Sequence, residues 1–323
     1  MKRIVVTGAA GQVGTELVPA LRTWHGEAAV LATDVRDRGN TGGGPFRRVD
    51  CMDAAQVAAA VREHRADTIF HLAALLSASA EKQPQNAYTV NTWTLYNVLE
   101  VAREAGCSVF VPSSIAVFGP GAPRDPAPQD ALQRPTTIYG VTKVAGELLC
   151  DYYHARFGVE VRGLRYPGLI SWVAPPGGGT TDWAVDIFHQ AVARREYECF
   201  LSSDTQLDMM FMADAIRAAH ELMQADGTRL VHRNAFNVTA MQLTPAGLAN
   251  AIRTHLPDFD IRYAVDPVRQ AIADSWPRRL DDSAARREWG WKPEYDSARM
   301  TADMLHHLSQ RAPGSGASAA GAA

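Results

Sequence analysis

The sequence predicts an α/β fold in which a doubly wound parallel sheet is followed by a smaller C-terminal α/β part. Up to residue 170, short apolar segments typical of buried strands alternate with longer segments of helical periodicity. This alternation favours parallel strands joined by right-handed crossovers. A glycine-rich turn also follows the first apolar segment directly, as it does in many doubly wound sheets.

We expect three parts along the chain. Residues 1–170 form the sheet domain, and later segments return to it. Residues 171–311 form most of a second, discontinuous domain that lies over the end of the sheet and binds substrate. Residues 312–323 contain only Gly, Ala, Ser and Pro, a composition that predicts a disordered tail.

The first expected strand, residues 3–7, runs into a turn that predicts a dinucleotide site. Gly8 and Gly11 permit a tight turn and a close ligand, and Gly14 lets the following helix pack on the strand. Strand, turn and helix together aim backbone N–H groups and a helix N-terminus at a pyrophosphate. This Rossmann-like arrangement places Gln12 and Val13 in the cofactor site as well.

The second expected strand, residues 29–33, ends at Asp34. A carboxylate there accepts both hydroxyls of the adenosine ribose and repels a 2′-phosphate, so we expect NAD rather than NADP. Arg36 and Arg38 follow closely and leave NADP open, and Asp34 as a simple turn residue is the alternative. A third strand, residues 46–49, ends at Asp50, a candidate partner for the adenine amino group.

The next segments supply further cofactor contacts. A helix capped by Asp53 extends through His64, and a strand over residues 68–72 then leads into small residues. Small side chains let a cofactor lie against the backbone, which predicts contacts from Leu72, Ala73 and Ala74. His71, at the strand end, is interpreted as a hydrogen-bonded structural histidine.

A long helix is expected from Pro84 to Glu104 and a fifth strand over residues 108–111. Asn91 lies among apolar residues of this helix, so it is either a buried amide with partners, near the cofactor, or part of a surface that faces another chain. Ser113 and Ser114 follow the strand, where doubly wound folds place ligand-contacting groups.

Tyr139 and Lys143 are the strongest candidates for chemistry. They begin a helix that reaches Phe157 and ends at Gly158, so their spacing puts both side chains on one helix face. An ammonium beside a phenol lowers the pKa of the phenol from about 10 toward neutrality, which makes tyrosine a general base. Because Tyr-x-x-x-Lys is common by chance, the catalytic interpretation depends on the other motifs around it.

A sixth strand, residues 159–164, precedes Tyr166, Pro167 and Ile170. Residues 175–182, rich in Gly, Pro and Thr, then predict a mobile loop before a helix over residues 183–193. Short strands are expected at 199–201 and 209–211. Further helices are expected at 213–224, 244–255, 283–288 and 297–308.

Bulk composition excludes several classes of protein. The formal net charge is −3 and Lys and Arg form no long cluster, so no nucleic-acid partner is expected. No apolar run reaches membrane-spanning length and the first residues do not suggest a signal peptide, so we expect a cytoplasmic protein without a membrane partner. Cys51, Cys107, Cys150 and Cys199 lack the spacing of metal ligands, so they are expected to be reduced thiols and no metal site is expected.

The order of these motifs resembles the extended short-chain dehydrogenase/reductase superfamily, which includes the sugar-nucleotide epimerases. The match covers about the first 170 residues. It implies a Rossmann-like fold and a nicotinamide cofactor. It also implies that the helices after Pro84 and around Tyr139 pair with a second copy, so a homodimer is expected.

Later segments are similar to the short-chain type of L-threonine 3-dehydrogenase. They are found at residues 164–171, 175–182, 184–188, 209–217, 272–277, 281–283 and 289–291, and include Arg-Tyr-Pro-Gly-Leu-Ile-Ser and Ile-Ala-Asp-Ser-Trp-Pro. Trp172 and Trp183 stand where other aromatic residues are expected. The resemblance implies oxidation of the threonine Cβ hydroxyl to a ketone with NAD, giving 2-amino-3-oxobutanoate.

The resemblance also implies roles for individual residues. Tyr139 is the base, Lys143 holds the nicotinamide ribose and favours the phenolate, and Ser114 orients the substrate oxygen. The backbone near Pro167 to Ile170, after Tyr166, positions the nicotinamide. The implied substrate contacts, besides Ser114 and Tyr139, are Ser77, Ser113, Gly179, Thr180 and Trp276.

Two other functions stay open on the sequence. A sugar-nucleotide epimerase or dehydratase would use the same fold and would retain its cofactor through the reaction. A catalytically silent NAD-binding regulator is the second alternative, and the intact Ser114, Tyr139 and Lys143 weigh against it. Trp276 is as readily interpreted as a packing tryptophan as a substrate contact.

Overall fold

The computed structural model describes residues 1–37, 39, 41–174 and 179–311. The expected tail, Arg38 and the first part of the predicted 175–182 loop lie outside the described residues. Within the described part of the chain, no helix is both long and apolar enough to cross a membrane.

A seven-stranded parallel sheet forms the larger part of the molecule, with strand order β10-β6-β5-β4-β1-β2-β3. The order reverses between β1 and β4, so the sheet is doubly wound and the predicted Rossmann-like fold is confirmed. In register, Thr7 at the end of β1 pairs with Thr33 on β2 and with His71 on β4. The strands are β1 (Ile4–Thr7), β2 (Val30–Asp34), β3 (Phe46–Arg48), β4 (Thr68–His71), β5 (Ser108–Ser114), β6 (Val161–Tyr166) and β10 (Phe236–Asn237).

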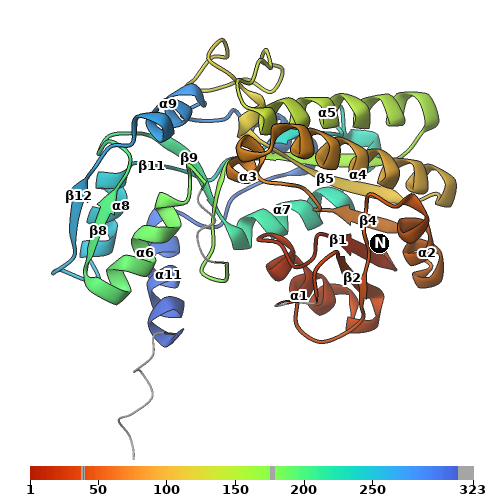
Figure 1. The fold of residues 1–323 in the computed structure, drawn as a ribbon, viewed down its shortest axis with the longest axis horizontal. Coiled ribbons are helices and arrows are strands. Elements are labelled where there is room, and N and C mark those ends of the chain that lie inside the picture. The colour runs from red at the N-terminus through yellow and green to blue at the C-terminus, as the bar shows by residue number, and fades with distance from the viewer. Residues whose placement is uncertain (38, 40, 175–178, 312–323) are drawn as a thin grey trace, which may run out of the picture.

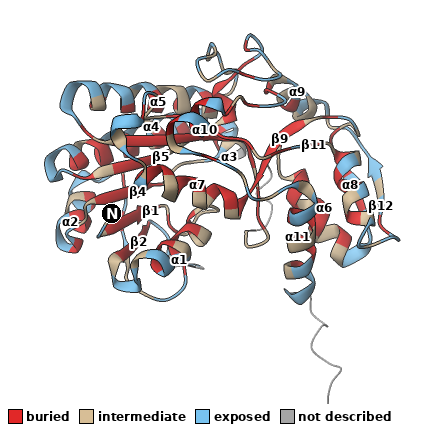
Figure 2. Ribbon diagram, turned by 180° about the vertical axis from the view of Figure 1, so that it is seen from behind, coloured by how far each residue is buried: buried red, intermediate tan, exposed pale blue. Residues whose placement is uncertain are grey.

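Helices cover both faces of this sheet because successive strand residues point to opposite sides. Ile4 and Val6 pack with α1 (Gly14–His25), α7 (Met212–Gln224) and α10 (Ser283–Trp289), whereas Val5 packs with the other layer. That layer contains α2 (Ala54–His64), α4 (Pro84–Ala105) and α5 (Ile138–Phe157). Figure 1 shows α4 and α5 side by side above the strands, and Figure 2 shows that the central strands are buried.

Helix ends follow local chemistry that the sequence predicts. The Asp53 side chain accepts hydrogen bonds from the N–H groups of Ala55 and Gln56 at the start of α2, which confirms the predicted cap. Thr137 caps α5 by accepting from the Gly140 N–H. Gly158 ends α5 with φ of 68°, a conformation that favours glycine.

Smaller elements make up the C-terminal part. One sheet has the order β11-β9-β7, with β7 parallel and β11 antiparallel to β9, and β12 pairs with β8 in parallel. These strands are β7 (Gly168–Ile170), β8 (Glu196–Cys199), β9 (Leu207–Phe211), β11 (Met241–Leu243) and β12 (Asp260–Tyr263). The helices are α6 (Trp183–Arg194), α8 (Pro245–Arg253), α9 (Pro267–Ser275) and α11 (Ser297–Arg311), and α3 (Ser77–Lys82) precedes α4.

Several boundaries differ from the expectations. The strand expected at residues 199–201 is wrong: β8 ends at Cys199, because residues 196–199 alternate between solvent and core. The sixth strand begins at Val161 rather than Val159. The short elements α3, α9 and β12 were not expected, although Asp266 before Pro267 is a cap signal at the start of α9.

Helices α6, α8 and α11 enclose a core of their own with β7, β9 and β11. This core includes Trp183 and Trp276, and Tyr139 of α5 packs against it. Tyr139 therefore lies where the C-terminal elements meet the large sheet. The division at residue 170 stays a prediction.

Candidate active site

The carboxyl ends of β1 and β4 meet at the point where the strand order reverses. Gly8 leaves β1 with φ of 65°, and a Cβ built there would lie 2.6 Å from Ala73 N and 2.7 Å from Leu72 C. The turn therefore packs directly on the backbone after β4, which leaves no room for a side chain. The Gly11 N–H donates to Gly8 O at 3.0 Å and closes the turn.

The same turn leads into α1 without space for larger residues. A Cβ at Gly14 would lie 2.5 Å from Ala9 O, so this glycine lets the helix begin against the turn. Val13 occupies the position just before the first helical residue, and Gln12 O accepts a bond from Thr15 Oγ1 at 3.1 Å. The helix N-terminus thus opens where the sequence predicts a pyrophosphate.

Asp34 is buried beside this turn. Its carboxylate accepts from Ala10 N at 3.0 Å, Arg36 N at 3.0 Å and Arg36 Nε at 3.1 Å. Burial opposes the charged form, but the bonds from Arg36 and Ala10 outweigh it and hold the pKa of Asp34 below its usual range. Asp34 therefore presents a negative charge at the turn, and the adjacent Arg36 forms an ion pair with it.

Asp50 lies at the exposed edge of the sheet beyond β3. Its Oδ1 accepts from Met52 N at 2.9 Å, so the side chain closes the turn before α2. Its predicted contact with adenine stays a prediction.

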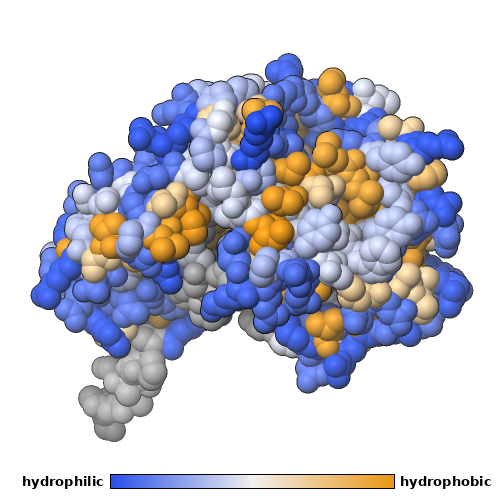
Figure 3. Space-filling view, turned by 45° about the horizontal axis from the view of Figure 1, so that its top comes forward, coloured by the Kyte–Doolittle hydropathy of each residue, from blue (hydrophilic) through white to orange (hydrophobic). Residues whose placement is uncertain are grey.

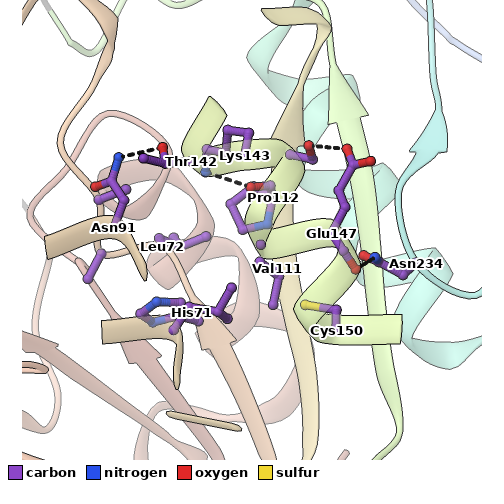
Figure 4. A pocket seen from close by; sticks show the side chains of 15 residues that line it. His71, Leu72, Asn91, Val111, Pro112, Thr142, Lys143, Glu147, Cys150 and Asn234 are labelled. Atoms are coloured by element: carbon purple, nitrogen blue, oxygen red, sulfur yellow. Dashed lines mark hydrogen bonds between the residues drawn. The ribbon is translucent and has the colours of Figure 1, made fainter. Parts of the chain in front are cut away.

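Asn91 fixes the segment that follows β4. Its Oδ1 accepts from Leu75 N at 2.7 Å, and its Nδ2 donates to Leu75 O at 3.1 Å. The Nδ2 also donates to Thr142 Oγ1 at 3.1 Å, a bond that Figure 4 shows. Of the two interpretations left open, the structure therefore supports the buried amide with partners. Asn91 ties the segment of Ala73 and Ala74 to α5. Ser77, at the first position of α3, is half-buried.

His71 is a structural residue, as predicted. Its Nδ1 lies 2.8 Å from Thr7 Oγ1, and the ring is buried. Burial, together with the charge of Lys143, lowers the pKa of His71 to about 3. The ring is therefore neutral at physiological pH and holds β1 and β4 together.

Tyr139, Lys143 and Ser114 come together at the end of β5. A Cβ at Gly140 would lie 2.3 Å from Ala116 O, so α5 starts in direct contact with the residues after Ser114. The Tyr139 side chain shares a hydrogen bond with Ser114, whose Oγ also accepts from Ala116 N at 3.2 Å. Lys143 Nζ lies 5.5 Å from the centre of the Tyr139 ring and donates to Pro112 O at 2.8 Å (Figure 4).

The expected lowering of the Tyr139 pKa by Lys143 is wrong for this structure. Burial raises the pKa of Tyr139 to about 12, and only the hydrogen bond with Ser114 works in the opposite direction. Burial also lowers the pKa of Lys143 to about 8. Loss of hydration is the largest cause of both shifts, because a phenolate and an ammonium are each poorly solvated in an apolar site.

The two serines face opposite ways. The Ser113 hydroxyl donates to the buried carboxylate of Glu147, and a strand residue points to the other side from its neighbour. Ser114 is therefore the serine whose hydroxyl lies at Tyr139. The hydroxyl of Ser113, a predicted substrate contact, is instead used in a hydrogen bond within the protein. Glu147 and Arg165 were not selected from the sequence, although Glu147 continues the spacing of Tyr139 and Lys143 by one more helical turn.

The segment after β6 and the predicted substrate loop lie against each other. A Cβ at Gly168 would lie 2.8 Å from Thr181 Cγ2, so the chain after Pro167 touches the residues that follow Thr180. Gly179 N donates to Asp182 Oδ2 at 2.7 Å, which pins the loop to the start of α6. Thr180 and Ile170 are buried beside this contact.

Two predicted site residues have structural partners. The Tyr166 hydroxyl donates to Ala215 O at 2.7 Å on α7, so its side chain packs between helix and sheet and leaves only its backbone for a cofactor. Trp276 is buried in the C-terminal core, and its carbonyl accepts from Arg124 Nε at 3.2 Å. The packing interpretation of Trp276 is the one that these contacts support.

Across the described residues, no three or more His, Cys, Asp or Glu side chains are grouped in a way that suits a metal ion. The arrangement is that of a nucleotide-binding turn next to a tyrosine, a lysine and a serine. A model of the NAD dependent epimerase/dehydratase family matches residues 4–238. The chain belongs to this family, and its cofactor is NAD.

Several similar proteins match almost the whole length of the chain. An uncharacterized epimerase/dehydratase of Staphylococcus saprophyticus is 52% identical over 308 residues, which are 94% of this chain and 96% of the relative. The solved L-threonine dehydrogenase of Clostridium difficile matches with a TM-score of 0.95 and 50% identity, covering 96% of this chain and 98% of that chain. The holo form of a GalE-like L-threonine dehydrogenase from Cupriavidus necator matches with a TM-score of 0.93 and 49% identity, covering 95% and 99%.

Proposed function

We propose that the protein is an NAD-dependent L-threonine 3-dehydrogenase of the short-chain type. The observation that carries the proposal is the similarity to solved L-threonine dehydrogenases at about half identity over nearly the full length of both chains. The segments that make the sequence similar to this class include residues 175–182 and 272–277, outside the cofactor turn. The reaction converts the Cβ hydroxyl of threonine to a ketone and yields 2-amino-3-oxobutanoate.

The residues at the switch point fit NAD. The glycine turn lies against Ala73 with no side chain between, and the buried Asp34 carboxylate stands beside Ala10. The turn would hold the pyrophosphate through Gly8, Gly11, Gln12 and Val13. Asp34 would bind the adenosine ribose, and the segment from Leu72 to Ala74 would lie against the side of the cofactor. Bound there, NAD supplies the acceptor for the hydride that leaves threonine Cβ.

The protein's own part in the reaction is to move one proton and to hold the substrate oxygen. Tyr139 Oη accepts the proton of the threonine hydroxyl as the base, and Ser114 Oγ donates a hydrogen bond to the same oxygen. Lys143 contributes a positive charge beside the phenolate. Because burial by itself raises the pKa of Tyr139 to about 12, the base depends on positive charge in the site to lose its own proton at neutral pH.

Threonine presents an ammonium and a carboxylate that also need partners. Ser77, Gly179 and Thr180 are the proposed contacts, since the segment after Pro167 touches the loop that contains Gly179 and Thr180. At the C-terminal end of this loop Gly179 N donates to Asp182, and before the loop the Ser171 hydroxyl donates to the side chain of Glu16 on α1.

The proposed function predicts that NADH accumulates when the protein is mixed with NAD and L-threonine. Absorbance of NADH measures this directly, with D-threonine, L-serine and a panel of sugar nucleotides as comparison substrates. If the amount of NADH rises steadily with time in the presence of L-threonine, the result supports the proposed dehydrogenase activity. Conversion of a sugar nucleotide without free NADH indicates an epimerase or dehydratase, because those enzymes recycle their cofactor. NAD binding without turnover of any substrate indicates a regulator.

We also propose that the enzyme is a homodimer that pairs through α4 and α5. Large side chains on these helices stay exposed, including Tyr88, Trp93 and Tyr96 on α4 and Leu148 and Tyr152 on α5. Figure 3 shows apolar surface gathered on this side of the molecule. An exposed apolar face of this kind marks a protein interface more often than free surface.

Pairing through this face predicts a particle of twice the chain mass of 35.1 kDa in sedimentation velocity. Leu148→Glu, which places a charge on a side chain that is 62% exposed, should yield the monomer. Leu132→Glu is the matched control, since Leu132 is 56% exposed but lies in the loop before α5. A wild-type monomer, or a dimer that survives Leu148→Glu but not Leu132→Glu, would contradict this interface.

A further inference from the structure

Glu147 is a buried carboxylate next to the proposed catalytic residues, and the reaction as described makes no use of it. It lies on α5 one turn beyond Lys143, as Lys143 lies one turn beyond Tyr139. Its side chain accepts from Ser113 Oγ, Gln133 Nε2 and two nitrogens of Arg165, the latter at 3.0 Å and 2.8 Å. A carboxylate with this many donors is held in one position.

Lys143 and Glu147 form hydrogen bonds with consecutive residues of β5. Lys143 Nζ donates to the carbonyl of Pro112, and Glu147 receives the hydroxyl of Ser113. The next residue along the strand is Ser114, which shares a hydrogen bond with Tyr139. Figure 4 shows Lys143 and Glu147 projecting from α5 toward β5 around a cavity of about 30 Å³. Helix α5, which contains the proposed base, therefore also fixes the position of the end of β5, which contains Ser114.

The far side of Glu147 is anchored to the rest of the sheet. Arg165 reaches it from β6 and also donates to Gln129 O at 2.7 Å, and Asn234 Nδ2 donates to the Glu147 carbonyl at 2.9 Å. These bonds connect α5 to β6 and to the chain before β10. Glu147 thus joins the end of β5 to the neighbouring strand β6.

The charge of Glu147 also acts on Lys143. Burial lowers the pKa of Lys143 to about 8, and Glu147 is the leading group that opposes this, followed by Cys150. The other titratable groups around the two residues are Tyr139 and Asp151 on α5, His71 on β4 and Arg165 on β6. His71 is neutral, and Arg165 is bound to Glu147, so the Glu147 carboxylate is the leading negative charge that favours the ammonium form of Lys143.

We propose that Glu147 is a positioning residue for the dehydrogenase: it holds Ser114 at Tyr139 through Ser113, and it keeps Lys143 in the ammonium form. The second half of this inference concerns the charge of Lys143 and holds whatever the substrate is. The first half rests on the proposed function, because its readout is turnover of threonine. The two halves are tested by different measurements.

The charge of Lys143 is measured without turnover by competitive acetylation. The protein is labelled with acetic anhydride over a range of pH, and mass spectrometry gives the reactivity of Lys143 relative to the exposed Lys2 and Lys292. In Glu147→Gln the pH at which Lys143 becomes reactive is expected to fall by about one pH unit, because a neighbouring negative charge is lost. Glu147→Asp, which keeps the charge, should stay close to wild type.

Glu100→Gln is the matched control for this measurement. Glu100 on α4 also accepts from a tyrosine, Tyr153, and from an arginine, Arg103, but it does not act on Lys143. Its variant should leave the reactivity of Lys143 unchanged. If Glu147→Gln does not fold, the double variant Glu147→Gln/Arg165→Gln takes its place, because it removes both buried charges. Arg165 is not among the groups that shift the pKa of Lys143, so the expected result is the same.

Ser113→Ala separates the positional role from the charge. It removes the bond to Glu147 but leaves the carboxylate, so kcat for threonine should fall roughly tenfold while the reactive pH of Lys143 stays constant. In Glu147→Gln the decline of kcat at high pH should also begin at lower pH. The same reactive pH of Lys143 in folded Glu147→Gln and wild type would overturn the charge role. An unchanged kcat in Ser113→Ala would overturn the positional role.

Discussion

Replacement of Tyr139 by phenylalanine is expected to lower kcat for threonine oxidation by about 10³-fold, because a positioned base contributes on that order to proton transfer. Phenylalanine keeps the ring that packs against the C-terminal core, and it removes only the hydroxyl that shares a bond with Ser114. The affinity for NAD should change little, since the glycine turn and Asp34 are untouched. Initial rates of NADH formation and calorimetric titration with NAD measure the two quantities.

Tyr153→Phe is the control for this result. Tyr153 lies on the same helix, is also buried, and bonds through its hydroxyl to Glu100 rather than to the site. Its variant should keep kcat within a few fold of wild type. If Tyr139→Phe retains wild-type turnover, Tyr139 is not the base and the mechanism proposed for this site fails.

Replacement of Gly8 by alanine is expected to weaken NAD binding by about 100-fold or more, since one or more charge-assisted hydrogen bonds worth about 1.5–3 kcal/mol each are lost. The added Cβ would lie 2.6 Å from Ala73 N, so the turn and the segment after β4 must move apart. The φ of 65° adds strain of about 1–2 kcal/mol for a residue with a Cβ. Calorimetric titration with NAD measures the loss of affinity, and a thermal melt measures the strain.

Gly106→Ala distinguishes the two causes. Gly106 ends α4 with φ of 70°, and a Cβ there would meet no atom within 4 Å. This variant should be destabilised by a similar strain but should bind NAD normally. If Gly8→Ala binds NAD as tightly as Gly106→Ala does, the turn does not hold the cofactor in the way proposed.

Much of the fold and part of the site were predictable because they depend on a few neighbouring residues. The turn from Gly8 to Gly14, the cap at Asp53 and the helix end at Gly158 are encoded within one or two turns of chain. The alternation of strands and helices then leaves few topologies for a parallel sheet. These features also placed Asp34 beside the turn and Tyr139 on one helix face with Lys143.

The C-terminal part was harder to predict because its short strands pair with distant segments. Cys199 reads equally well as the start or the end of a strand, and only the pairing of Glu196–Cys199 with Asp260–Tyr263 decides between them. A one-residue difference in register reverses which side chains are buried. Helix α3, of six residues, is likewise held by its contacts rather than by a strong local pattern.

The sequence by itself determined the type of sheet, the nucleotide turn and the identity of the residues that we propose as the base and its neighbouring charge. The tertiary structure alone decided how those residues behave. It turned Ser113 toward Glu147 and left Ser114 at Tyr139, it packed Trp276 into a core, and it raised rather than lowered the pKa of Tyr139. The reason is physical: local conformation depends on neighbours in the chain, whereas the direction of a strand side chain and the hydration of a phenol depend on groups brought from far along it.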